Sequence, residues 1–257
     1  MGKHRAVMDL ERNEWIAALG IAEEDIPHAV ILEGSWWRAQ RTEWRLSLLE
    51  EVRELAFPDL FLGYWKGRPV VYSCIYGAAR AVEPSHLFGV LGTPRMAMIG
   101  TCGALHPGLT TGDVVVPSIA VPQEGVAHLY GAGETVEADP HLTRQGRRFL
   151  MKRDIKAADS THLSWVSIFA QSGEMVADWR RSGYESVDME AATLFAVAQH
   201  YGFEAVAFLV VWDQLDLDRS FLDPLDPRGQ ARLDQANQAV FEAALAVLLD
   251  PDPMEGN

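Results

Sequence analysis

The sequence predicts an α/β protein with a central, mostly parallel or mixed sheet flanked by helices on both faces. Apolar runs of strand length alternate along the chain with segments of helical periodicity. Apolar residues make up 48% of the 257 residues, enough to bury a large sheet. No linker, internal repeat or low-complexity segment divides the chain. We therefore expect one domain over residues 1–257, with an N-terminal extension at 1–25 and a frayed tail at 251–257.

The alternating pattern gives the expected elements in order. The strands are predicted at Ala29–Leu32, Leu60–Trp65, Val70–Ile75, Arg95–Ile99, Asp113–Ala120, His162–Phe169 and Glu204–Val211. The helices are predicted at Arg38–Leu55, Pro84–Leu91, Pro140–Lys152, Asp188–Tyr201 and Gly229–Leu249. Parallel sheets bind ligands outside the carboxyl ends of their strands. Four positions fall at such ends, namely Gly34, Gly100-Thr101, Phe169 and Asp213.

Charge and cysteine content exclude several classes of function. The net charge is −14, with 36 acidic against 22 basic residues, which argues against nucleic-acid or anionic-membrane partners. Cys74 and Cys102 provide no disulfide framework, and the eight histidines show no metal-ligand spacing on one helix. Because no apolar segment suits a signal peptide or a membrane span, we expect a cytoplasmic protein without a metal site.

The segment YESVDMEAATLF, residues 184–195, is the most informative in the chain. Its apolar residues follow helical spacing, Asp188 is placed to cap the helix, and Gly202 follows its end. Glu190 is therefore expected in the first turn, with its carboxylate facing a cavity. A lone glutamate there is often only an acid favoured by the helix dipole. The segments around it favour a functional role instead.

Four segments in order resemble the nucleoside phosphorylase and uridine phosphorylase family. They are AVILEGSWWRA (29–39), MIGTCGALHPGLTTGDVVVPSIAV (98–121), VDMEAATLFAVAQHYG (187–202), and AVAFLVV (205–211) with the following Trp212-Asp213. The resemblance covers nearly the whole chain. It implies an enzyme that cleaves the N-glycosidic bond of a nucleoside with inorganic phosphate as co-substrate and with no cofactor.

The resemblance also implies a phosphate site. Gly34 and Arg38 occupy the positions that hold phosphate in the family, although Trp36-Trp37 replace the usual Asp-Pro, and Thr101 matches its phosphate-binding hydroxyl. The strand-to-helix turn at Gly34 also offers backbone N–H groups to an anion. However, Met98 stands where the family commonly has an arginine.

Two further arginines are candidates for the phosphate site. Arg80, in the segment YGAARAVEPSH (76–86), is a possible substitute for the arginine missing at position 98. Arg53 lies roughly where family members contribute an arginine across a subunit interface. The resemblance therefore implies a homo-oligomer, a dimer or a trimer of dimers.

The remaining candidates concern ribose and base. The resemblance implies that Glu190 binds the ribose hydroxyls and Met189 packs on the sugar. Phe169, Ile168 and Gly103 lie where the family contacts the base, and Asp213 follows the last apolar strand. Negative charge develops on a departing base, and a protonated Asp213 near purine N7 would neutralise it. Burial is able to raise a carboxyl pKa enough for that role.

Three functions stay open. Uridine-cleaving members read the pyrimidine with a Gln-x-Arg pair, and here Gln171 has no arginine nearby, since position 175 is Met, so a purine nucleoside is favoured. A hydrolytic nucleosidase is the nearest alternative, because Met98 cannot neutralise phosphate. A non-catalytic nucleoside-binding protein is the third, suggested by Trp36, Trp37 and by Trp212, which replaces the usual Ser.

Overall fold

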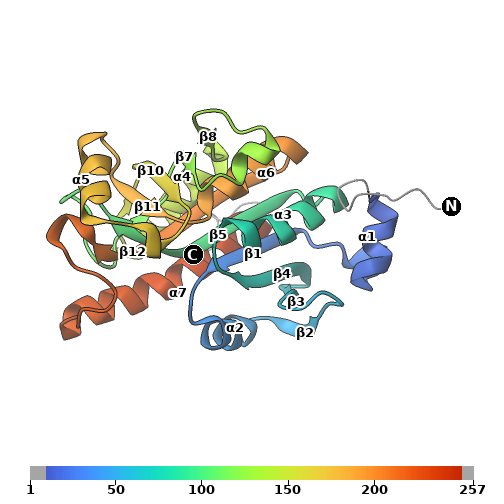
Figure 1. The fold of residues 1–257 in the computed structure, drawn as a ribbon. Helices are drawn as coiled ribbons and strands as arrows, with labels where there is room; N and C mark the ends of the chain where they lie inside the picture. The colour runs from blue at the N-terminus through green and yellow to red at the C-terminus, as the bar shows by residue number, and fades with distance from the viewer. Residues whose placement is uncertain (1–9, 251–257) are drawn as a thin grey trace.

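The computed structural model describes residues 10–250 as one mixed β-sheet covered by helices on both faces (Figure 1). This arrangement confirms the expected α/β fold. The expected frayed tail at 251–257 and the first nine residues of the expected N-terminal extension lie outside the described residues. No helix among residues 10–250 combines the length and the apolar character needed to cross a membrane.

Four parallel strands form the centre of the sheet. They are β1 (Ala29–Gly34), β4 (Arg68–Ile75), β5 (Arg95–Ala104) and β12 (Glu204–Gln214). β1 pairs with β4 on one side and with β5 on the other, and β12 pairs with β5. The β5–β12 register shifts between Val211 and Asp213. Because the carboxyl ends of these strands meet at one edge, Gly34, Thr101 and Asp213 come together there.

Shorter strands extend the sheet on both sides. β2 (Glu50–Glu54) and β3 (Phe61–Trp65) continue it antiparallel beyond β4. On the other side β11 (Ser186–Asp188), β10 (Thr161–Trp165), β7 (Ile119–Gln123) and β8 (Val136–Glu137) follow β5. The short strands β6 (Val114–Val115) and β9 (Ala157–Ala158) branch from β12.

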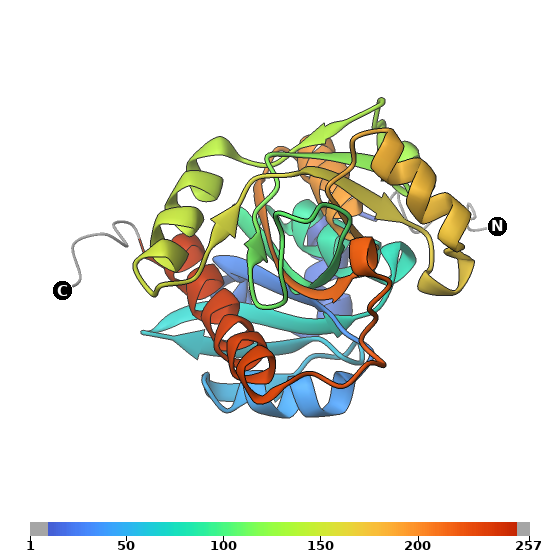
Figure 2. The same ribbon diagram turned by 90° about the vertical axis from the view of Figure 1, so that its left-hand side faces the viewer.

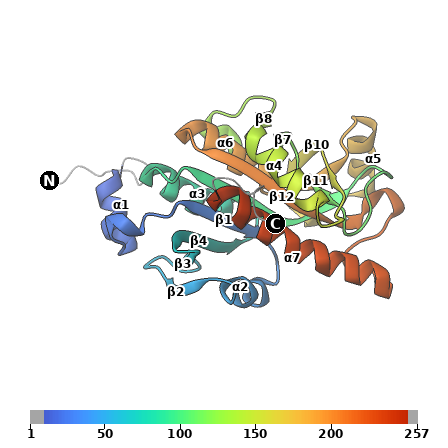
Figure 3. The same cartoon turned by 180° about the vertical axis from the view of Figure 1, so that it is seen from behind.

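The helices divide between the two faces of the sheet (Figures 2 and 3). One apolar core includes α1 (Arg12–Leu19), α3 (Ala78–Leu91) and α6 (Ala191–Tyr201). The core on the opposite face includes α4 (Pro140–Met151) and α7 (Pro227–Leu249), and α2 (Arg38–Leu46) packs at its margin. α5 (Gly173–Arg181) covers β10 and β11 through Trp179. Short 3-10 turns lie at Glu23–Asp25, Ala127–Tyr130, Ile168–Ala170 and Leu215–Leu217.

The structure corrects several predicted boundaries. The helix expected over Arg38–Leu55 ends at Leu46, because Glu50–Glu54 pairs with β3 as an exposed edge strand. Pairing with a neighbouring strand here overrides local helix propensity. The strand expected over Asp113–Ala120 is two strands, β6 and β7, which pair with different neighbours.

Two predicted termini also shift. The strand expected over His162–Phe169 ends at Trp165, where β10 leaves its partners. The helix expected from Pro84 begins at Ala78, and Pro84 lies inside it. The buried Ala78 and Ala81 explain the longer helix, since they pack its first turn onto the sheet. α1 and α5 were not predicted from the sequence.

Candidate active site

A pocket opens at the carboxyl ends of β1, β5 and β12, beside β11 and the start of α6. It is lined by seven residues predicted from the sequence, namely Gly34, Thr101, Gly103, Ile168, Met189, Glu190 and Asp213. Glu190, predicted to bind ribose, and Asp213, predicted to act on the base, therefore line one cavity. Gly34 and Asp213, about 180 residues apart in sequence, meet there because the parallel strands end at the same edge.

Contrary to the prediction, Glu190 is not in the first turn but is the N-cap of α6, because the helix begins at Ala191 and not at Asp188; Glu190 is 6% exposed. The backbone N–H of Gly77 donates to its Oε1 at 2.6 Å. Gly34 approaches the other oxygen so closely that a Cβ at position 34 would lie 3.0 Å from Oε2. Burial, and then the nearby Asp188 carboxylate, raise the pKa of Glu190 to about 8. Glu190 is therefore held in place from two loops and retains its proton near neutral pH.

Asp188 caps α6, as its position in the sequence predicts. Its Oδ2 accepts from the Ala191 backbone N–H at 2.8 Å, and its Oδ1 accepts from the Ser164 hydroxyl at 2.6 Å. The Ser164 hydroxyl in turn accepts from the Ala192 backbone N–H at 2.9 Å. The helix start that carries Glu190 is thus fixed to the end of β10 by buried hydrogen bonds.

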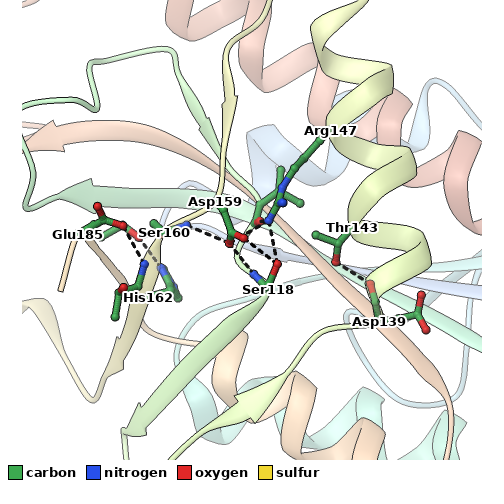
Figure 4. Close-up of polar contacts among 11 residues, drawn as sticks. Ser118, Asp139, Thr143, Arg147, Asp159, Ser160, His162 and Glu185 are labelled. Atoms are coloured by element: carbon green, nitrogen blue, oxygen red, sulfur yellow. Dashed lines mark hydrogen bonds and ion pairs between the residues drawn. The ribbon is translucent and has the colours of Figure 1, made fainter. Parts of the chain in front are cut away.

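Behind Asp188 lies a buried polar chain that the sequence analysis did not find. His162 Nε2 lies 3.0 Å from Asp188 Oδ1, and His162 Nδ1 lies 2.7 Å from the Ser186 hydroxyl. The Ser186 and Ser160 hydroxyls are 2.6 Å apart. Figure 4 shows His162 and Ser160 within this part of the molecule. His162 is a polar residue at a buried position of an apolar strand, and this pattern in the sequence could have indicated the polar chain.

An ion-paired cluster lies next to these hydrogen-bonded side chains (Figure 4). Asp159 accepts from the Ser118 backbone and hydroxyl at 2.9 Å each and pairs with Arg147 at 2.9 Å. The Ser160 backbone N–H donates to the same carboxylate at 3.0 Å. These contacts fix the start of β10 against β7 and thereby the position of His162.

Asp213 lies at the register shift near the end of β12. Its Oδ1 is buried and has no hydrogen-bond partner among residues 10–250. Burial raises the pKa of Asp213 to about 6, against an opposing backbone hydrogen bond at Phe221. An acid of this kind is protonated in about half of the molecules at pH 6 and in about one tenth at pH 7. It is therefore suited to donate a proton within the pocket.

Aromatic side chains form one wall of the pocket. Trp36 stacks on Tyr76 with ring centroids 5.5 Å apart, and the Phe169 ring meets its edge at 5.3 Å. Trp37 stacks on Trp212 at 5.2 Å. Phe169 lies in a 3-10 turn and is exposed, so it reaches the site through Trp36 and is outside the pocket lining.

The arginines predicted for phosphate point elsewhere. Arg38 donates to Asp59 at 3.3 Å, Arg80 donates to the same carboxylate oxygen at 3.4 Å, and neither lines the pocket. Arg53 pairs with Asp25 at 2.8 Å on the far side of β3. Their roles in phosphate binding stay predictions. Met98 is fully buried in the core, so its position offers no cation to the pocket.

One arginine that the sequence analysis did not select does line the pocket. Arg41, one turn after Arg38 on α2, is 17% exposed and lies 3.7 Å from Glu33 Oε1. Glu33 is buried at the end of β1 and also holds the fully buried Arg45. Arg41 follows Arg38 by three residues, which places both side chains on neighbouring parts of one helix surface. This spacing could have identified Arg41 as a second candidate for the phosphate site.

Among residues 10–250, no group of three or more His, Cys, Asp and Glu side chains has an arrangement suited to a metal ion.

Relatives of known name resemble this chain over most of its length. A purine nucleoside phosphorylase of the DeoD type from Caldanaerobacter subterraneus subsp. tengcongensis is 26% identical to this chain. The match covers 77% of this chain and 87% of the length of that enzyme. A uridine phosphorylase from Thermococcus kodakarensis is 27% identical over 70% of this chain and 71% of its own. A guanosine phosphorylase from Halorubrum lacusprofundi is 28% identical over 66% of this chain and 71% of its own.

A solved structure shares the fold. The uridine phosphorylase of Vibrio fischeri ES114, crystallised with 6-hydroxy-1-naphthoic acid, superposes with a TM-score of 0.76 at 20% identity. The match covers 90% of this chain and 94% of that one. The family model described as the phosphorylase superfamily matches residues 30–248, which include every element that lines the pocket. These findings confirm the predicted family and support the predicted class of enzyme, and we conclude that this chain belongs to the phosphorylase superfamily.

Proposed function

We propose that this protein cleaves the N-glycosidic bond of a purine nucleoside by phosphorolysis and releases the free base and ribose 1-phosphate. The observation that carries the proposal is the meeting of two acids with raised pKa values, the buried Glu190 and the half-buried Asp213, in one pocket. Perturbed acids that converge in a cavity are typical of catalytic sites. The relatives named as nucleoside phosphorylases support the same reaction.

Glu190 is proposed to bind the ribose hydroxyls, with Met189 against the sugar. Positive charge builds on the ribosyl carbon as the glycosidic bond breaks, and hydrogen bonds from the Glu190 carboxyl to the ribose hydroxyls that tighten in this step stabilise the transition state more than the ground state. The Gly77 hydrogen bond and the close approach of Gly34 hold the Glu190 carboxyl in one position. This preorganisation supports a catalytic contact.

Asp213 is proposed to protonate the departing base, with Ile168 and Gly103 around the base and with Phe169 acting through its ring contact with Trp36. Purine N7 is a basic nitrogen that accepts such a proton, which favours purine over pyrimidine nucleosides. The relatives are named for both classes of substrate, one as a purine nucleoside phosphorylase and one as a uridine phosphorylase. Trp212, stacked on Trp37 beside Asp213, narrows the range of orientations open to the base.

Phosphate is proposed to bind at Gly34 and Thr101. Gly34 lies beside Gly100 in the sheet, and a Cβ at position 100 would lie 2.9 Å from the Gly34 carbonyl oxygen. Gly34, Gly100 and Thr101 all line the pocket, and their backbone groups and the Thr101 hydroxyl are the proposed contacts to phosphate. Hydrolysis by water is the second candidate, because Arg38 and Arg80 hold Asp59 and do not reach the pocket.

One assay separates the candidates. Purified protein is incubated with inosine, adenosine or uridine, with and without phosphate, and the sugar product is identified. Phosphorolysis gives ribose 1-phosphate only when phosphate is present. Free ribose at the same rate without phosphate would support the hydrolase instead, and the absence of cleavage with bound nucleoside would support a binding protein.

A further inference from the structure

The pocket contains a cation that no predicted role uses. Arg41, on α2, lines the same pocket as Gly34 and Thr101. Among residues 10–250 its guanidinium makes no hydrogen bond, and its nearest acidic partner, Glu33 Oε1, is 3.7 Å away. That distance is longer than a hydrogen bond, so the guanidinium donors of Arg41 stay available to a ligand.

Glu33 is already satisfied by other partners. Arg45 donates to its two oxygens at 2.8 and 3.1 Å, and the Tyr72 hydroxyl donates to it at 2.9 Å. Arg45 also donates to the Asn237 carbonyl at 2.8 Å and is fully buried. Two guanidinium groups therefore face one carboxylate, and one positive charge is left uncompensated at the pocket wall.

The other charges of the pocket do not cancel this one. Burial raises the pKa of Glu190 to about 8, so it holds its proton at neutral pH, and Asp213, whose raised pKa is about 6, makes no ion pair with Arg41 among residues 10–250. Asp188 faces His162 and the Ser164 hydroxyl on the opposite side. Arg41 is consequently the guanidinium to which an anion in this pocket has access.

We propose that Arg41 binds the phosphate co-substrate and supplies the cation that Met98, Arg38 and Arg80 do not. The inference rests on the proposed phosphorolysis. Arg38 pairs with Asp59, whereas Arg41, about one helical turn further along α2, lines the pocket. A guanidinium suits this role because its planar fork matches two oxygens of a phosphate.

The test measures phosphate saturation at a fixed, saturating inosine concentration. Arg41→Ala is expected to raise the phosphate KM by about 10- to 100-fold, the size of effect that loss of a charged hydrogen-bonding partner produces. The nucleoside KM should stay close to that of the wild type. Arg41→Lys keeps the charge and should recover part of the loss. Arg153→Ala, a surface arginine paired with Glu242, is the matched control.

A second measurement does not depend on catalysis. Binding of inorganic phosphate to the free protein is followed by intrinsic tryptophan fluorescence, since Trp36, Trp37 and Trp212 line the same pocket. Wild-type protein should bind phosphate and Arg41→Ala should bind it more weakly by the same factor as in the kinetic assay.

The outcomes separate the two proposals. If cleavage requires phosphate but Arg41→Ala leaves phosphate saturation and binding unchanged, the assignment of Arg41 is wrong while phosphorolysis stands. A large effect of Arg38→Ala or Arg80→Ala with none from Arg41→Ala would return the role to those residues. If the wild type cleaves without phosphate and does not bind it, both proposals are overturned.

Discussion

Replacing Asp213 by asparagine is expected to stabilise the protein above pH 6 and to abolish most of its activity. Burial is the main reason that the folded state raises the pKa of this carboxyl to about 6 from an ordinary value of 3.8. The folded protein therefore binds the proton more tightly than the unfolded chain does. Asp213 contributes stability at low pH, and that contribution is lost as the pH rises through about 6.

The size of the effect follows from the two pKa values. A difference of about two pKa units corresponds to about 3 kcal/mol in the free energy of unfolding between low and high pH. Between pH 5 and pH 8 the same pair of values gives about 1.4 kcal/mol. Asparagine does not titrate, so this part of the pH dependence should disappear in Asp213→Asn. Glu190 titrates in both proteins, and its contribution cancels in the comparison.

Activity should change in the opposite direction. Asparagine cannot transfer a proton to a departing base, and the loss of a general acid lowers rates by about 100- to 10,000-fold. In the wild type, kcat/KM should fall as the pH rises above about 6, because the protonated fraction of Asp213 falls. The measurements are urea unfolding at pH 5 and pH 8 and the pH profile of kcat/KM for both proteins.

Two results would refute this reasoning. A variant that keeps the wild-type turnover would show that Asp213 donates no proton. A variant whose unfolding free energy keeps the wild-type dependence on pH between 5 and 8 would show that Asp213 does not titrate with a raised pKa.

Three further predictions concern the site and the assembly. Glu190→Gln keeps an acceptor for the Gly77 N–H but removes the ionisable carboxyl group. The turnover number should fall by the equivalent of about 2–4 kcal/mol in the free energy of activation. Unchanged turnover in a folded variant would leave Glu190 a purely structural role. Gly34→Ala places a Cβ 3.0 Å from Glu190 Oε2, so kcat should fall while circular dichroism stays that of the wild type, and an unaffected kcat would mean that the Glu190 position is not critical. Sedimentation at micromolar concentration should show dimers or a multiple of dimers, and a fully active monomer of 28.5 kDa would contradict the expected homo-oligomer.

The sequence predicted the parts of the site that depend on local order along the chain. Gly34, Thr101 and Asp213 each lie in the last residues of an apolar strand, and parallel pairing brings such positions to one edge. Asp188 and Glu190 were placed by the cap that begins α6. Each of these predictions required only the type of an element and its end, both of which are encoded within about ten residues.

The sequence did not predict which arginine faces the pocket. Arg38 turns away because Asp59, in the loop before β3, offers it a carboxylate, and Arg80 turns to the same residue. Such a choice depends on contacts between segments distant in sequence, which periodicity does not reveal. The edge strand Glu50–Glu54 was missed for a similar reason, since its pairing with β3 is a tertiary contact.

The position of Arg41 has a consequence for how the two substrates are held. Met98 faces the core that contains α3 and α6, and Leu32, its partner in register on β1, faces the same core. Neighbouring residues of a strand point to opposite faces, so Glu33 points toward α2 and α7, where it meets Arg45 and Arg41.

With Arg41 as the proposed phosphate-binding cation, the positive charge lies on the α2 face of the sheet and not on the face of Met98, and the proposed ribose contact, Glu190, lies at the start of α6. Gly34 ends β1, and a Cβ at this position would lie 3.0 Å from Glu190 Oε2. If phosphate is held from the α2 side and ribose from the α6 side, the two binding steps are separable by mutation. Substitutions at Arg41 should change phosphate dependence alone, and substitutions at Glu190 should change the ribose step at every phosphate concentration.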